Sequence, residues 1–340
     1  YQQALRFRTP DAAPLQYATT QNNLGIAYSD LPTGDRDAQD ERAANLQRAI
    51  DCYEKALHIP NLPLWEKARY LRNFGDAYRA AENYDAAMDT YRQALALEPD
   101  NANAWYSVAS IAHGQNEWET AKEAYLKVIE LAPDYAWSYH NLGRIHARFG
   151  DYDEAIKLYR EAIERHESDE NRALSWSRIA DAYRRQGQIQ DATAAYQRTL
   201  SLNPDSASDR TMLGSLYELQ GQLEDALHEH QRAVELDPDT GMRHASLSSV
   251  LRKLGRNAEA AEHLARAREL VPEDDDYNLT CLEAIAGNVD VALDHLEKAI
   301  AWDATLRDWA ARDPDLEPLR GNPRFEAMVR DKATNERMSE

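Results

Sequence analysis

The chain has 340 residues, of which 43% are hydrophobic and 29% are charged, a balance that permits a buried core and excludes a disordered chain. Its formal net charge of −20 repels nucleic-acid phosphates and anionic lipid surfaces, so we expect neither a nucleic acid nor a membrane as a partner. Its two cysteines, Cys52 and Cys281, lie far apart and form no disulfide framework, which favours a cytoplasmic location.

The N-terminal end is predicted to hold an irregular helix pair. Residues 1–16 include YQQALRF, which resembles the end of a second helix whose first half is missing. Residues 17–67 supply a first helix, YATTQNNLGIAYSDL, and a second helix, NLQRAIDCYEKAL, with a charged insertion between them. Because the chain starts with Tyr1 and not with methionine, we expect it to be a fragment of a longer protein.

The central part of the sequence repeats with a period of 34 residues. Prolines recur at intervals of 34, 71, 34 and 34 residues, and the interval of 71 is two periods plus a three-residue insertion. These prolines are Pro99, Pro133, Pro204, Pro238 and Pro272. The register divides residues 68–274 into six segments, which are 68–101, 102–135, 136–169, 173–206, 207–240 and 241–274.

The second half of each segment is predicted to be an amphipathic helix. Small, large and small side chains recur at spacings of four and three residues, so they share one helical face. The first small position is always alanine, and the large position is mostly tyrosine. The three columns are Ala87, Ala121, Ala155, Ala192, Ala226 and Ala260; Tyr91, Tyr125, Tyr159, Tyr196, His230 and Leu264; and Ala94, Val128, Ala162, Thr199, Ala233 and Ala267.

The first half of each segment is predicted to be a helix that approaches its neighbour closely. Glycine inside a helix costs about 1 kcal/mol relative to alanine, so a recurring small residue needs a packing reason. The small residues are Gly75, Ala109, Gly143, Ala180, Gly214 and Ser248. A second glycine, at 150, 187, 221 and 255, is expected to end this helix in a left-handed turn.

The C-terminal end departs from the period. Residues 275–303 are predicted to be a shortened helix pair, because Ala292, Leu296 and Ala299 still fit the columns. Residues 304–340 contain prolines followed by a polar tail, and we expect them to close the last apolar face as a cap.

These columns resemble the tetratricopeptide repeat (TPR). The segment LRNFGDAYRAAENYDAAMDTYRQALALEPDN resembles that repeat over its full length. The resemblance, to TPR proteins of a bacterial type, implies an all-α fold, a right-handed superhelical solenoid of about eight helix hairpins with irregular ends. In such proteins the first helices line a concave groove that binds extended peptides or partner helices.

No motif for catalysis, a cofactor or a metal stands out. The histidines form no HExxH motif, and His228 and His230 lack a third ligand at a suitable spacing, so we interpret them as surface or groove histidines. No glycine-rich phosphate loop is present, and Cys52 and Cys281 are expected to be small buried hydrophobes. We therefore expect no catalytic residue, no cofactor, no metal and no enzymatic activity.

The first helices are comparatively basic. Their charges sum to +8 over the six regular segments, in a chain whose total is −20. Arginine can bind a carboxylate through two parallel hydrogen bonds, and the resemblance implies that asparagine at 23, 73 and 141 holds a peptide backbone. An alternative is that the arginines cover apolar surface and pair with Asp76 or Asp181. The predicted partner-binding residues are Asn23, Arg69, Arg72, Asn73, Arg79, Tyr106, His140, Asn141, Arg144, Arg148, Arg178, Arg184 and Arg185.

Two functions fit these observations. The first is a protein–protein interaction scaffold that binds an acidic peptide or partner protein in its groove. The second is a sensor or regulatory segment of a larger bacterial signalling or defence enzyme. This alternative arises because TTQNNLGIAYSDLPTGDR and NLQRAIDCYEKAL resemble repeats that accompany caspase-like proteases and signalling ATPases. A protease or ATPase domain encoded in the same reading frame would favour the second function.

Overall fold

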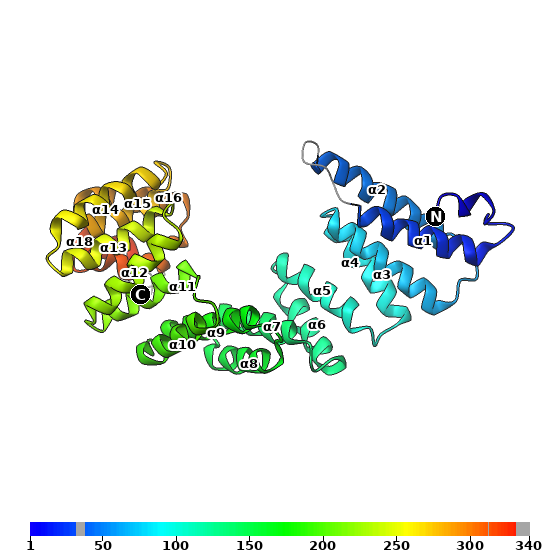
Figure 1. Cartoon of the computed structure of the whole chain (residues 1–340), viewed down its shortest axis with the longest axis horizontal. Coiled ribbons are helices and arrows are strands. Elements are labelled where there is room, and N and C mark those ends of the chain that lie inside the picture. The colour runs from blue at the N-terminus through cyan, green and yellow to red at the C-terminus, as the bar shows by residue number, and fades with distance from the viewer. Residues whose placement is uncertain (32–37, 312, 331–340) are drawn as a thin grey trace, which may run out of the picture. The chain divides into compact units, whose positions relative to one another are not determined.

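The computed structural model describes residues 1–31, 38–311 and 313–330, and in these residues every regular element is a helix. The helices follow one another in pairs (Figure 1). Their bounds are η1 (Ala4–Arg6), α1 (Pro14–Ser29), α2 (Ala38–Leu57), α3 (Leu64–Ala80), α4 (Tyr84–Leu97), α5 (Ala102–Gly114), α6 (Trp118–Leu131), α7 (Ala136–Arg148), α8 (Tyr152–Arg165), α9 (Asp169–Arg185), α10 (Ile189–Leu202), α11 (Ala207–Leu219), α12 (Leu223–Leu236), α13 (Gly241–Lys253), α14 (Asn257–Leu270), α15 (Asp276–Ala286), α16 (Val289–Trp302), α17 (Leu306–Ala310), η2 (Pro314–Leu319) and α18 (Pro323–Val329).

The chain divides into two compact units. Unit 1 comprises Tyr1–His166, and unit 2 comprises Glu167–Glu340. Within each unit the strongest packing joins the two helices of a pair, and each second helix also packs on the first helix of the next pair. The expected all-α stack of helix pairs is therefore confirmed within each unit.

The small and large columns of the sequence meet inside each pair. Tyr91 and Tyr159 are at most 1% exposed, and their rings lie against the small residues of the first helices. A Cβ atom at Gly75 would lie 2.8 Å from Cε1 of Tyr91, and one at Gly143 would lie 2.8 Å from Cε1 of Tyr159. The glycines thus provide the space that the tyrosine rings fill, which is the packing reason for a glycine inside a helix.

The turn between the two helices of a pair needs one residue with positive φ. The glycines at 150, 187, 221 and 255 have φ between 74° and 81°, as the sequence predicts. In two earlier pairs Glu82 and Asn116 adopt φ values of 58° and 62° in the corresponding turns. The turn geometry is therefore shared by all of these pairs, although only four of them use glycine.

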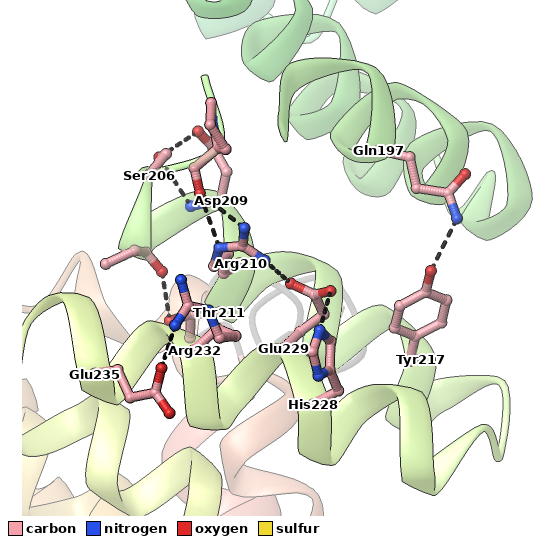
Figure 2. A network of polar contacts seen from close by, with 12 residues as sticks. Gln197, Ser206, Asp209, Arg210, Thr211, Tyr217, His228, Glu229, Arg232 and Glu235 are labelled. Atoms are coloured by element: carbon pink, nitrogen blue, oxygen red, sulfur yellow. Dashed lines mark hydrogen bonds and ion pairs between the residues drawn. The ribbon is translucent and has the colours of Figure 1, made fainter. Parts of the chain in front are cut away.

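Polar contacts fix the joint between α9–α10 and α11–α12 in unit 2. Ser206 caps α11, because its hydroxyl accepts from the Asp209 amide at 3.3 Å. Figure 2 shows Arg210 reaching toward α12, where its Nη1 donates to Glu229 at 2.6 Å. The same guanidinium donates to the Pro204 carbonyl at 2.8 and 3.0 Å. Arg210 and Glu229 each have side chains only 13% exposed, so this ion pair joins the two helices of one pair, while the bonds to Pro204 tie α11 to the preceding connector.

The two ends of the chain differ from the regular pairs. The helical end expected within YQQALRF is only a 3-10 turn over Ala4–Arg6, since it has no first helix to pack against. Helix α2 begins at Ala38, so part of the charged insertion is helical, and residues 32–37 lie outside the described residues. At the other end, Ala310, Leu316 and Phe325 are at most 1% exposed and pack with the apolar residues of α15 and α16.

None of the helices in the described part of the chain combines the length and the apolar character that a membrane crossing requires.

Candidate functional site

Half-buried and exposed polar side chains lie along α3, α5 and α7 in unit 1. We call the surface formed by Arg72, Asn73, Arg79, Tyr106, Asn141, Arg144 and Arg148 the α3–α5–α7 face. The buried columns behind these residues fix the rotation of each helix, so the opposite side of each first helix must face outward.

Tyr106, Asn141 and Arg144 form a hydrogen-bonded chain that links α5 to α7. The Asn141 amide donates to the Tyr106 hydroxyl at 3.3 Å, and Arg144 donates to the Asn141 Oδ1 at 3.5 Å. Burial raises the pKa of Tyr106 above its usual value, whereas Asn141, Arg79 and Arg144 act to lower it. Arg79 of α3 and Arg144 of α7 therefore both direct positive charge at the same phenol.

Arg79 has a local acidic partner, but the contact is loose. Its Nη2 lies 3.9 Å from Asp76, and both side chains are about half exposed. The Asp76 carboxylate also accepts a hydrogen bond of 2.6 Å from the buried Tyr91 hydroxyl. Because Asp76 is held by Tyr91, much of the guanidinium of Arg79 remains available to solvent or to a ligand.

Arg148 stacks on an aromatic ring. Its guanidinium carbon lies 4.6 Å from the centre of the Trp118 ring, a cation–π contact. His113 lies beside it, and its pKa is lowered by burial and by the positive charges of Arg144 and Arg148. His113 is therefore neutral near pH 7, and the positive charge of this region belongs to the arginines.

Asparagines cross-link the first helices at the N-terminal end of unit 1. The Asn73 amide donates to Asn22 Oδ1 at 3.0 Å, and the Asn22 amide donates to Asn23 Oδ1 at 3.3 Å. Asn22 is 1% exposed and connects the two predicted residues, although the sequence analysis did not select it. The doublet of asparagines at 22 and 23 is the signal that could have indicated such a link.

Arg69 and Arg72 lie on α3 but differ in their surroundings. Arg69 stacks near Trp65 and Tyr70, with distances of 5.5 and 5.3 Å to the ring centres. Its role in packing matches the alternative in which arginine covers apolar surface. Arg72 is partly buried and makes no ion pair within the residues that the structure describes.

The expectation that His140 faces outward is wrong. Its side chain is only 5% exposed and lies among the rings of Trp137, Tyr159 and His166, with centroid distances of 5.2, 5.4 and 6.4 Å. His166 is the C-cap residue of α8, the second helix of the same pair, and its ring covers this position. His140 therefore packs inside unit 1.

Two of the three predicted arginines in unit 2 form ion pairs with an aspartate of their own helix. Arg184 lies 2.7 Å and Arg185 lies 3.1 Å from the carboxylate of Asp181. Burial raises the pKa of Asp181, but the two arginines outweigh it and hold that pKa below its usual range. The alternative of pairing with Asp181 thus describes these two residues, whereas Arg178 of the same helix is exposed.

A second charged network occupies α11 and α13 of unit 2. Glu218 accepts from Lys253 at 2.7 Å and forms a 3.0 Å hydrogen bond with His230. Burial acts to raise the pKa of Glu218, but these bonds outweigh it and lower the pKa. His230 is 1% exposed, so the expectation that it is a surface or groove histidine is wrong: its ring replaces the tyrosine ring that other pairs place against glycine.

The C-terminal segment covers part of unit 2. A pocket of about 240 Å³ lies between α11, α13, α15 and η2, and it includes Glu218, Lys253 and Asp315 in its lining. Farther along, the Trp309 ring lies 5.8 Å from the guanidinium carbon of Arg185. The segment after α16 thus approaches Arg185, a first-helix residue that the sequence pattern predicts to bind a partner.

Potential metal ligands meet once in the part of the chain that the structure describes. Ligand atoms of Cys281, Asp313 and Asp315 lie within 4.8 Å of one another. Asp313 accepts a hydrogen bond of 2.8 Å from Tyr277 and another of 3.0 Å from the Asp315 amide, so it has a structural role in capping η2. Both free cysteines are buried as expected, and burial raises their pKa values, which disfavours a reactive thiolate.

Comparisons with known proteins agree with this architecture. Residues 100–168 and 177–241 each match a family model described as "Tetratricopeptide repeat", and residues 75–115 match one described as "TPR repeat". No curated protein sequence matches the chain.

Several solved structures share the fold. A tetratricopeptide repeat protein from Parabacteroides merdae is 15% identical, with a TM-score of 0.54 over 82% of this chain and 99% of that one. PilF of Pseudomonas aeruginosa is 18% identical, with a TM-score of 0.53 over 62% of this chain and 95% of that one. PilW, a type IV pilus biogenesis factor, is 20% identical, with a TM-score of 0.52 over 61% and 95%.

Proposed function

Because the chain is a tetratricopeptide-repeat protein, we propose that it is a protein-interaction scaffold whose α3–α5–α7 face binds an acidic peptide or an acidic surface of a partner protein. Stacked helix pairs offer a broad, rigid surface on which ligand-binding side chains can be arranged without any catalytic centre. We propose that this chain itself catalyses no reaction.

The observation that carries the proposal is that two arginines on α7 are exposed and have no internal carboxylate partner in the part of the chain that the structure describes. Among the described residues, neither Arg144 nor Arg148 has a carboxylate within ion-pair distance, and both are exposed. Arg184 and Arg185 of α9 instead share the carboxylate of Asp181. An unpaired guanidinium keeps its capacity for two parallel hydrogen bonds, so a carboxylate of a partner can bind Arg144 or Arg148 without displacing an internal one.

The negative net charge of the chain bears on whether the partner is acidic or basic. The chain has a net charge of −20, and the arginines of the α3–α5–α7 face form a locally positive region within it. Such a region attracts an acidic ligand and repels a basic one. The same net charge supports our proposal that nucleic acids and anionic membranes are not partners. The two free, buried cysteines are compatible with a cytoplasmic location, which we also propose.

The repeat register predicted for residues 68–274, with irregular segments at 1–16, 17–67, 275–303 and 304–340, remains our proposal for the limits of the TPR units. It is supported by helix pairs that begin at α3, α5, α7, α9, α11 and α13.

Affinity capture from a native lysate, followed by mass spectrometry, tests the scaffold function. We expect the wild-type chain to retain a defined partner and the double variant Arg144→Glu with Arg148→Glu to lose it. A matched control, Arg92→Glu with Arg232→Glu, makes the same charge change at exposed positions of the second helices α4 and α12 and should retain the partner. Circular dichroism should show the same helix content in all three proteins. Equal capture by the wild type and the α7 variant would refute a role for this face.

A further inference from the structure

The turn edge of unit 1, where first helices end and second helices begin, exposes an aromatic residue that internal packing covers only in part. Phe149 is the C-cap residue of α7, and 63% of its surface is exposed. The corresponding C-cap residue is glutamine after α5, α9 and α11, namely Gln115, Gln186 and Gln220. A large apolar ring therefore stands at a water-facing position where three other pairs have a polar side chain.

Phe149 belongs to a cluster that we call the Phe149 patch, made of His113, Trp118, Arg148 and Phe149. The Phe149 ring meets the partly buried Trp118 ring edge to face, with 6.1 Å between centroids. Arg148 covers Trp118, and the His113 ring lies 5.5 Å from it. Nδ1 of His113 has no hydrogen-bond partner among the described residues. Aromatic and arginine side chains of this kind dominate the energetics of protein recognition.

A separate hollow of about 310 Å³ lies between α3, α4 and the C-terminal turn of α5 on the same unit. Gly114 leaves part of this hollow open, because a Cβ atom on it would meet nothing within 4 Å. The hollow is lined by Arg79, Tyr84, Ser110, Ile111, Gly114 and Gln115. Its volume reaches the lower end of the range for ligand pockets, so it can accept a side chain of a bound peptide.

We propose that this turn edge binds an acidic peptide through an aromatic side chain of that peptide, which packs on Trp118 and Phe149. The carboxylates that flank this aromatic residue pair with Arg144 and Arg148. This inference rests on the proposed function and adds the chemistry of the ligand: acidic residues around an aromatic residue. The aromatic contact supplies the apolar burial that an exposed ion pair alone does not.

Three fluorescein-labelled synthetic peptides test the inference by fluorescence polarisation. The first has a central phenylalanine flanked by aspartate and glutamate, the second replaces the phenylalanine with alanine, and the third keeps it but replaces the acids with asparagine and glutamine. The proteins are the wild type, Phe149→Gln and, as a matched control, Trp302→Gln at another strongly exposed aromatic residue in unit 2. Phe149→Gln introduces the residue that three equivalent turns already use, so it should fold normally.

We expect the wild type to bind the acidic phenylalanine peptide about tenfold more tightly than the acidic alanine peptide, and Phe149→Gln to remove that difference. Trp302→Gln should bind like the wild type. Equal binding of both acidic peptides by the wild type would overturn this inference and leave the proposed function standing. If neither acidic peptide binds, or if the uncharged peptide binds as tightly as the acidic phenylalanine peptide, the acidic ligand itself is refuted.

Analytical ultracentrifugation completes the test, because an exposed aromatic cluster can also join two copies of one chain. We expect the wild type and Phe149→Gln to have the same oligomeric state. If the wild type dimerises and Phe149→Gln does not, the patch is an interface between copies and the peptide proposal is wrong.

Discussion

Replacing Gly143 with alanine tests whether the small column exists to admit the tyrosine ring. The new Cβ atom would lie 2.8 Å from Cε1 and 3.0 Å from Cδ1 of Tyr159. That ring is 1% exposed and lies 5.4 Å from the His140 ring, so it has little room to move. Overpacking of this kind costs about 1–3 kcal/mol, and alanine recovers about 1 kcal/mol through its higher helix propensity. We expect a net loss of about 1 kcal/mol in the free energy of unfolding.

Gly114→Ala is the matched control, because it makes the same chemical change on a first helix of the same unit. Gly114 is the last residue of α5, and its Cβ would meet nothing within 4 Å. This variant should be unchanged or stabilised by up to about 1 kcal/mol. Denaturant unfolding followed by circular dichroism measures both variants. Equal midpoint shifts, or a more stable Gly143→Ala, would refute the packing argument.

Two further predictions concern unit 2. Burial, with Asp313 and Glu218, raises the pKa of Asp315 from 3.8 to about 7. The folded state therefore holds a proton that the unfolded state loses, so stability should fall as pH rises from 4 to 7. This difference in pKa corresponds to a fall of about 4 kcal/mol, which Asp315→Asn should remove; unfolding across this pH range measures it, and an unchanged profile would contradict it. Arg210→Gln leaves Glu229 without its partner and should cost about 2–3 kcal/mol in thermal unfolding, and a neutral result would contradict the role of that pair.

The buried architecture could be predicted because it follows from helical periodicity. Tyr91 and Tyr159 were placed in a buried column by spacings of four and three residues, and both are at most 1% exposed. The glycine turns at 150 and 187 follow from the need for positive φ. The buried columns depend on the direction of the Cα–Cβ bond, which the register of a helix fixes, and the glycine turns depend on a residue without a Cβ atom.

The state of the exposed side chains could not be predicted in the same way. Arg148 and Arg185 occupy the same column of the repeat, but Arg148 stacks on Trp118 and Arg185 pairs with Asp181. A long arginine side chain reaches partners on its own helix, on the next helix or in a distant segment, and the register does not choose among them. His140 illustrates the same point, because the His166 ring that covers it comes from the end of the following helix.

The differences between equivalent positions of the repeats therefore carry the functional information. The six pairs from α3–α4 to α13–α14 share the turn that ends the first helix, so any side chain at its C-cap position is compatible with the fold if water can reach it. Glutamine at this position, as in Gln115, Gln186 and Gln220, leaves no aromatic surface in water. Phe149 exposes an aromatic ring there. Phe149 packs against Trp118 but leaves most of its surface exposed, which is best explained by a bound state in which the ring is covered, and the positive charge of Arg148 beside it favours an acidic ligand.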